Sequence, residues 1–330
     1  MRGLGACALA ALLLPSSLTP GESQTRDQAV SSLTIFAGTG SGLFRSRDWG
    51  NTWEQVKAPA LEGMGAVRAI VATGSFVFAG GDGGLCFSDD FGATWVKTYA
   101  ASPALALAVS RSPLADPTVF LGTPEGLRRS SDLGRNFAAT ALEGTPAFRI
   151  EWPGPDLVVA TGRGVVVFRA GSKAYESGSG LPEGRVAALA VSSFFVVDPV
   201  AFAGVPGQGV FQSRDGARTW KPVGLPGRTV SDLLWFGPIL YAATDAGFFQ
   251  SDDVGATWTA HNDGIERRVV TRILFPFYPA SAADTFLGTD SGIFWTGDAA
   301  AHWRATGLKD EAILALATFP QPDPVQKRKK

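Results

Sequence analysis

Charged side chains interrupt several of the short apolar segments of this 330-residue sequence. Segments such as ALALAV (104–109) and VAALAV (186–191) have the composition of a buried strand. The corresponding segments elsewhere contain arginine, aspartate or glutamate, and more arginines lie in the loops nearby. The candidate ligand-binding residues are Arg68, Arg149, Glu151, Arg185, Arg228, Asp232, Arg267, Arg268 and Arg272.

A charge on an inner strand must be paired or must face water, because burying it alone is costly. In one interpretation, Arg149 or Arg272 forms ion pairs with Asp232 or Glu151 inside a channel. In the other, the arginines form a basic entrance suited to an acidic peptide or a carboxylate. Glycoside hydrolysis needs two carboxylates about 5 to 10 Å apart. Glu151 and Asp232 are candidates, but the sequence shows no acid/base environment around them.

A second set of carboxylates recurs in an eight-residue segment, which we call the Asp box. Six copies keep a hydroxyl residue, an Asp two positions later and a final aromatic residue: SRDWGNTW (46–53), SDDFGATW (88–95), SSDLGRNF (130–137), SRDGARTW (213–220), SDDVGATW (251–258) and TGDAAAHW (296–303). A seventh segment, FRAGSKAY (168–175), keeps only the aromatic residue.

The Asp box is better explained by turn formation than by catalysis. An Asp side chain accepts hydrogen bonds from backbone N–H groups just after it, and Gly permits the left-handed φ of a tight turn. The final aromatic ring is suited to packing as an apolar plug. We expect structural roles for Ser46, Asp48, Trp53, Ser88, Asp90, Trp95, Ser130, Asp132, Phe137, Ser213, Asp215, Trp220, Ser251, Asp253, Trp258, Asp298 and Trp303.

The repeats predict an all-β fold, a seven-bladed β-propeller with four-stranded blades. The seven segments start 38 to 45 residues apart, and each unit contains four short strands separated by Gly-rich turns. The first unit lacks its opening strand, and one surplus strand, AILALAT (312–318), follows the last unit. This C-terminal strand is expected to complete blade 1 and so remove exposed sheet edges. The predicted propeller domain is 30–320.

The termini have a different composition. Residues 1–22 contain an early arginine and an apolar run too short to span a bilayer, which predicts a cleaved export signal peptide. A lipid-anchored form at Cys7 is disfavoured because the apolar run follows that residue. Without Cys7, Cys86 has no disulfide partner. The tail 321–330 is basic and predicted to be disordered. We expect a periplasmic or extracellular protein with no transmembrane span in its mature chain.

Other classes of site are disfavoured by the composition. The formal net charge is −1, which gives no general attraction for nucleic acid. Two histidines, His261 and His302, and no cysteine pair leave no zinc site. We therefore expect no metal and no cofactor.

The Asp boxes resemble those of the Asp-box (bacterial neuraminidase repeat) superfamily over residues 33 to 318. Among single propellers the pattern is most similar to photosystem II stability/assembly-factor-like proteins. That resemblance implies an exported, seven-bladed protein that aids the assembly of membrane complexes without catalysis, and a protein or peptide partner in the envelope or membrane. Such a partner would bind the face that carries the turns between second and third strands.

Enzymes with the same box match less well. FRIEWP (148–153) resembles the Phe-Arg-Ile-Pro motif of sialidases, but Glu151 replaces the proline and the motif lies mid-chain. Xyloglucanases use a cleft between two propellers, and one propeller is predicted here. The function predicted is therefore a non-catalytic binding or assembly scaffold. The alternative is a carbohydrate-active propeller, either a lectin-like binder or a sialidase-like or xyloglucanase-like glycoside hydrolase.

Overall fold

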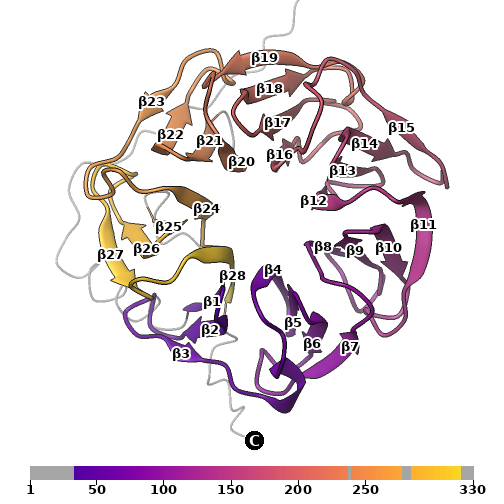
Figure 1. Ribbon diagram of the computed structural model, residues 1–330, viewed down its shortest axis with the longest axis vertical. Coiled ribbons are helices and arrows are strands. Elements are labelled where there is room, and N and C mark those ends of the chain that lie inside the picture. The colour runs from indigo at the N-terminus through magenta and orange to yellow at the C-terminus, as the bar shows by residue number, and fades with distance from the viewer. Residues whose placement is uncertain (1–32, 237–238, 277–283, 321–330) are drawn as a thin grey trace, which may run out of the picture.

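Seven four-stranded antiparallel sheets are arranged as a ring around a central channel (Figure 1). The computed structural model describes residues 33–236, 239–276 and 284–320. Its only helical element in these ranges is a short 3-10 helix, η1 (Pro59–Leu61). The predicted seven-bladed propeller is therefore confirmed.

Each blade is a sheet in which the first strand lies at the channel and the fourth at the periphery (Figure 1). Blades 1 to 3 contain β28 (Ile313–Pro320), β1 (Leu33–Thr39), β2 (Gly42–Ser46) and β3 (Glu54–Gln55); β4 (Val67–Thr73), β5 (Phe76–Gly81), β6 (Gly84–Ser88) and β7 (Val96–Tyr99); and β8 (Ala106–Val109), β9 (Val119–Thr123), β10 (Gly126–Ser130) and β11 (Ala138–Glu143). Blades 4 and 5 contain β12 (Ala147–Glu151), β13 (Leu157–Thr161), β14 (Gly164–Phe168) and β15 (Tyr175–Ser177); and β16 (Ala188–Val191), β17 (Ala201–Val205), β18 (Gly209–Ser213) and β19 (Lys221–Gly224). Blades 6 and 7 contain β20 (Val230–Phe236), β21 (Ile239–Thr244), β22 (Gly247–Ser251) and β23 (Thr259–Ala260); and β24 (Val270–Leu274), β25 (Thr285–Thr289), β26 (Gly292–Thr296) and β27 (Arg304–Gly307).

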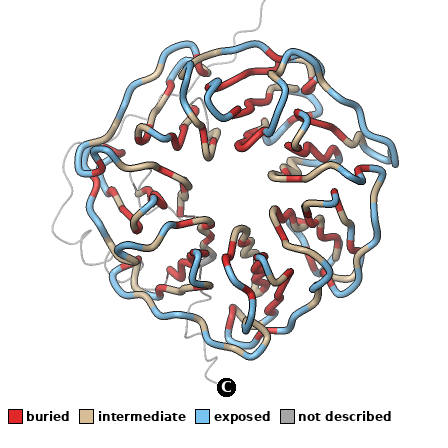
Figure 2. Tube along the Cα trace, viewed as in Figure 1, coloured by how far each residue is buried: buried red, intermediate tan, exposed pale blue. Residues whose placement is uncertain are grey.

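The burial of the strands follows their position in the blade (Figure 2). Second strands such as β1, β13 and β25 are buried at every residue, because neighbouring blades cover both of their faces. Their sequences are accordingly continuous apolar runs rather than alternating patterns. The outermost strands β3, β15 and β23 are exposed throughout.

The ring is closed by pairing the two ends of the described chain. Strand β28 pairs antiparallel with β1, from Leu33 opposite Pro320 to Thr39 opposite Ile313. The predicted closure by residues 312–318 is confirmed, with strand bounds shifted to 313–320. Because β28 occupies the inner position of blade 1, the inner edge of β1 is paired and this blade has four strands like the others.

The turns between second and third strands are built from a repeated threonine–glycine contact. The Thr123 hydroxyl donates to the Gly126 carbonyl at 3.0 Å, and Thr244 donates to Gly247 in the same way at 2.8 Å. Gly126 has a φ of +132°, which side chains other than hydrogen rarely tolerate. In both turns two residues separate the threonine from the glycine, so the bond closes a short turn between the two strands.

The Asp boxes form local hydrogen-bond networks between third and fourth strands. In the box of blade 2, the Ser88 hydroxyl donates to Asp90 Oδ1 at 2.8 Å and accepts from the Gly92 N–H at 2.8 Å. Thr94 donates to Asp90 through its N–H (2.8 Å) and through its hydroxyl (2.7 Å). Trp95 Nε1 donates to the Gly92 carbonyl at 3.1 Å. Both carboxylate oxygens of Asp90 are thus engaged within the turn.

Candidate functional site

The register of the first strands brings three of the candidate charges to one level of the channel. Arg149, Asp232 and Arg272 each follow a register shift in their strand and each pair with the same position of the second strand. The residues at this level in the other four blades are Ala69, Ala106, Ala188 and Ala315. This level, which we call the charged ring, therefore combines two arginines and one aspartate with four alanines.

Arg149 reaches from blade 4 to blade 6 across the intervening blade. Its Nη1 donates to its neighbour's carbonyl, Phe148 O, at 3.0 Å, and its Nη2 donates to Ser231 O at 3.2 Å. Blade 5 contributes the buried Ala188 at this level.

Asp232 and Arg272 are bonded mainly to backbone. The Asp232 carboxylate accepts from the N–H of Leu233 at 3.2 Å and from the N–H of Ile273, in the next blade, at 3.1 Å. Arg272 Nη1 donates to Thr271 O at 2.6 Å. Burial and, to a smaller extent, the charge of Arg149 lower the pKa of Arg272 to about 9, against the opposing charge of Asp232.

The predicted ion pairs inside the channel are wrong. No salt bridge within 4.0 Å joins Arg149 or Arg272 to Asp232 or Glu151 among the described residues. The physical reason is that these side chains bond to backbone groups instead. The two arginines donate to carbonyl oxygens, and Asp232 accepts from backbone N–H groups. The positive charge of the two guanidinium groups is consequently only partly compensated within the charged ring.

Two further arginines extend this positive region. Arg185, in the loop before β16, stacks on the Phe148 ring with its guanidinium carbon 4.2 Å from the ring centroid. Partial burial, followed by the charges of Arg149 and Arg68, lowers the pKa of Arg185. Arg68 forms an exposed salt bridge of 3.0 Å with Asp82.

The remaining candidate arginines lie in inter-blade loops and make separate contacts. Arg268 donates to the Ser291 hydroxyl and lies over the Phe294 ring at 5.6 Å. Arg267 has a left-handed φ of +63°. The backbone carbonyl of Arg228 accepts from the Gly209 N–H at 3.1 Å. None of these three side chains contacts the charged ring in the described structure.

Glu151 lies at the other end of its strand from the inter-blade loops. Burial and, to a smaller extent, the charge of Asp232 raise its pKa to about 7, against the opposing charges of Arg149 and Arg111. The sequence did not reveal this shift in the pKa of Glu151, because its causes are burial and the charge of Asp232 in another blade. Arg111 was not a candidate, because it follows the first strand of blade 3 and only the closed ring brings its charge near Glu151.

Blade 4 has no Asp box, and an ion pair takes its place. Asp156 accepts from the Ala170 N–H at 2.9 Å and from Arg169 Nη1 at 2.9 Å. Arg169 Nη2 also donates to Gly216 O in the next blade at 2.7 Å. Tyr175, the aromatic residue that this segment keeps, is 39% exposed and packs on Phe168 of its own blade, with centroids 5.6 Å apart.

The structure gives no sign of a reactive cysteine, a metal site or a membrane span in the described residues. Cys86 is buried, and burial raises the pKa of its thiol to about 11. Within the described ranges no three His, Cys, Asp or Glu side chains are close enough to hold a metal ion. The same ranges contain no helix long and apolar enough to cross a membrane.

Comparisons with known proteins support the propeller fold but identify no family for this chain. No protein-family model and no curated protein matches the chain. Among solved structures, YCF48 bound to D1 peptide is similar with a TM-score of 0.61 and 18% identity, over 81% of this chain and 88% of that one. YCF48 from Cyanidioschyzon merolae is similar with a TM-score of 0.60 and 14% identity, over 82% and 93% of the two chains.

Similar folds also occur in larger proteins. The GH74 enzyme of Niastella koreensis is similar with a TM-score of 0.57 and 15% identity, over 86% of this chain and 60% of that one. The extracellular domain of BT4673 from B. thetaiotaomicron is similar with a TM-score of 0.60 and 13% identity, over 72% of this chain. The matched region is 33% of that domain. At these identities the likeness shows the propeller fold alone.

Proposed function

We propose that this chain is an exported, non-catalytic scaffold that binds an acidic peptide or carboxylate of a partner protein at the arginine-lined end of its channel. The observation that carries the proposal is that Arg149 and Arg272 face the channel with carbonyl oxygens, not carboxylates, as their hydrogen-bond partners. A guanidinium group has five N–H donors, so each retains donors for a ligand. A carboxylate would supply the missing negative charge through paired hydrogen bonds.

The surroundings of the two guanidinium groups support an anionic ligand. Arg185 adds positive charge near Arg149, and burial together with the charge of Arg149 lowers the pKa of Arg185. Only Asp232 contributes a carboxylate to the charged ring, and backbone N–H groups occupy it. A peptide ligand is also consistent with the similar fold of YCF48, a protein whose structure contains D1 peptide.

The experiment is affinity purification from the native cell envelope with wild type and with Arg149→Ala/Arg272→Ala. A matched control is Arg47→Ala/Arg304→Ala, which removes two exposed arginines from the periphery. We expect an envelope or membrane protein to co-purify with wild type and with the control, and to be lost from the channel variant. Equal recovery with all three proteins would contradict the proposal.

A carbohydrate-active propeller is the second candidate, and one observation favours it. Glu151 has its pKa raised to about 7 with Asp232 nearby, which is the asymmetry that a general acid and its partner carboxylate require. The GH74 enzymes have a similar fold. A glycan array and a hydrolysis screen test this candidate: turnover that Glu151→Gln abolishes would establish it in place of the scaffold.

Export is proposed from residues 1–22, which lie outside the described residues. Expression with and without this segment, followed by fractionation and mass determination of the mature N-terminus, tests it. The expected result is a shortened chain in the periplasm or medium only when the segment is present.

A further inference from the structure

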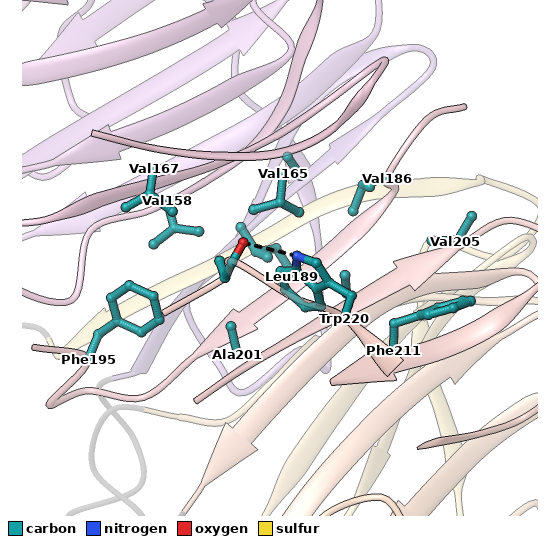
Figure 3. Packing of buried hydrophobic residues seen from close by; sticks show 13 residues of the cluster. Val158, Val165, Val167, Val186, Leu189, Phe195, Ala201, Val205, Phe211 and Trp220 are labelled. Atoms are coloured by element: carbon teal, nitrogen blue, oxygen red, sulfur yellow. Dashed lines mark hydrogen bonds between the residues drawn. The ribbon is translucent and has the colours of Figure 1, made fainter. Parts of the chain in front are cut away.

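The aromatic residue that ends an Asp box fills the seam between its own blade and the preceding one. Trp220 of blade 5 lies in one buried cluster with Val165 of blade 4 (Figure 3), and its Nε1 donates to Ala217 O at 3.2 Å. Trp303 of blade 7 packs on Phe248 of blade 6 with centroids 5.3 Å apart. The other box aromatics pack in the same way beside the second residue of the preceding third strand: Trp53 beside Ile293, Trp95 beside Leu43, Phe137 beside Leu85 and Trp258 beside Val210.

The seam between blades 3 and 4 is different because blade 4 has no box. Leu127 occupies the position of Val165 in blade 3, but its buried cluster contains no box aromatic. Trp152, which follows the first strand of blade 4, packs edge to face on Phe120 at 5.1 Å. Tyr175 stays in its own blade, as described above.

A groove of about 730 Å³ lies at this seam, and we call it the blade 3–4 groove. Leu127, Phe120 and Trp152 form apolar parts of its lining, and the small residues Ala138–Ala141 of the outer strand form one wall. A volume of this order is typical of ligand pockets. Leu127 itself is 1% exposed, so the accessible apolar surface of the groove comes from its partly buried aromatic lining, Phe120, Trp152 and Phe168.

The rim of the groove is positively charged. Arg129 and Lys173 are exposed and form no salt bridge or side-chain hydrogen bond among the described residues, whereas Arg169 is paired with Asp156 and Glu176. One carboxylate, Asp116, also lies on the rim and accepts from the Thr118 N–H at 3.2 Å. The two unpaired cations outnumber it, so the rim complements a negatively charged partner.

We propose that the blade 3–4 groove binds a segment of a partner protein that inserts an aromatic side chain flanked by carboxylates. The aromatic side chain would pack against Phe120 and Trp152, and the carboxylates would pair with Arg129 and Lys173. This is a second site that the channel function does not require, since the groove contains none of the charged-ring residues.

The test uses three labelled seven-residue peptides and fluorescence anisotropy. The first has a central tryptophan with glutamates on both sides, the second has alanine in place of tryptophan, and the third has lysines in place of the glutamates. We expect the first peptide to bind at least about tenfold more tightly than the other two. Equal binding of all three peptides, or no binding of the first at about 1 mM, would overturn the proposal.

Two matched tryptophan substitutions localise the binding. Ala138→Trp fills the groove from its own wall, because Ala138 lies opposite Arg129 in the register. Val96→Trp is the control, since Val96 is the equivalent residue of blade 2 and the adjacent seam already holds Phe137. Ala138→Trp should weaken the first peptide at least about tenfold, and Val96→Trp should leave its affinity within about twofold. Equal losses in both variants would rule out the groove.

Further variants separate this site from the channel. Arg129→Glu/Lys173→Glu should weaken the glutamate peptide and strengthen the lysine peptide, whereas the peripheral control Arg47→Ala/Arg304→Ala should change neither. Amide hydrogen exchange should show protection by the first peptide in β10 and β11. Protection confined to the first strands, with loss of binding in the channel variant, would assign the peptide to the channel and refute the groove.

Discussion

The Arg149 guanidinium in blade 4 donates a hydrogen bond of 3.2 Å to the Ser231 carbonyl in blade 6. The bond joins the inner strands of two blades that are not neighbours, β12 and β20, across the buried Ala188 of blade 5. It holds a positive charge in the channel without a carboxylate partner. This relationship is the basis of the first prediction.

Replacing Arg149 by methionine should reduce the affinity for an acidic ligand more than it reduces the stability of the fold. Methionine keeps much of the side-chain length and loses the charge, so we expect at least about tenfold weaker binding of a glutamate-rich peptide. Isothermal titration calorimetry at about 50 and about 500 mM salt checks this, since screening should weaken wild-type binding and affect the variant less. Salt-independent binding to wild type would argue against an electrostatic site.

The stability of the protein should depend on the protonation of Glu151. Its folded-state pKa of about 7 lies above its ordinary value of 4.5, so the folded form favours the protonated group. The stabilisation of the fold by protonated Glu151 is therefore fully present below pH 4.5 and is lost as the pH rises through about 7. The difference sets an upper limit of roughly 3 kcal/mol, which the partial solvent exposure of the side chain reduces.

Urea unfolding of wild type and Glu151→Gln between these pH values measures this contribution. We expect wild type to lose stability as the pH rises to neutral and Glu151→Gln to keep its stability. At neutral pH the variant should therefore be more stable than wild type. Parallel pH profiles for the two proteins would show that Glu151 does not titrate in this window.

Removing a box carboxylate should destabilise the fold, whereas removing its neighbour should not. Hydrogen bonds from Thr94 lower the pKa of Asp90 to about 2, so its contribution is present above pH 3.8 and is lost as the pH falls through about 2. Asp90→Ala should cost about 1 to 3 kcal/mol at neutral pH. The exposed Asp89 provides the control, and Asp89→Ala should change the free energy of unfolding by less than about 0.5 kcal/mol.

The aromatic residues of blades 4 and 5 should differ sharply in their effect on stability. Trp220 is 4% exposed and fills a seam, so Trp220→Ala should cost about 3 to 5 kcal/mol. Tyr175 is 39% exposed, so Tyr175→Ala should cost less than about 1 kcal/mol. Thermal and urea denaturation of the two variants compare them directly. Similar losses would mean that Tyr175 supports its blade as a box aromatic does.

Ending the chain before Ile313 should prevent the ring from closing. Such a truncation removes β28 and leaves the buried inner edge of β1 without its partner. We expect aggregation or loss of cooperative unfolding, observed by size-exclusion chromatography and circular dichroism. A chain that ends at Pro320 keeps the whole strand and serves as the control, with unfolding like that of the full protein. A monomeric, cooperative short form would contradict the closure mechanism.

Local patterns were sufficient to predict the propeller. The spacing of the Asp boxes, the apolar second strands and the surplus strand at 312–318 report on contacts made within one repeat or between its copies. Such contacts depend on residues that are close in the sequence or that recur in each repeat, so they can be predicted from the sequence pattern. The missing box of blade 4 was visible in the same way, but its consequence was not, because Tyr175 could have filled the seam.

The arrangement of the candidate site was decided by the tertiary structure. The sequence by itself determined the number of blades, the strand that closes the ring and the presence of charges on inner strands. Only the closed ring decided that Arg149 bonds to a carbonyl two blades away, that Arg111 lies near Glu151 and that the blade 3–4 groove stays open. The physical reason is that these contacts join residues from different repeats, where register, side-chain reach and burial depend on how all seven blades pack together.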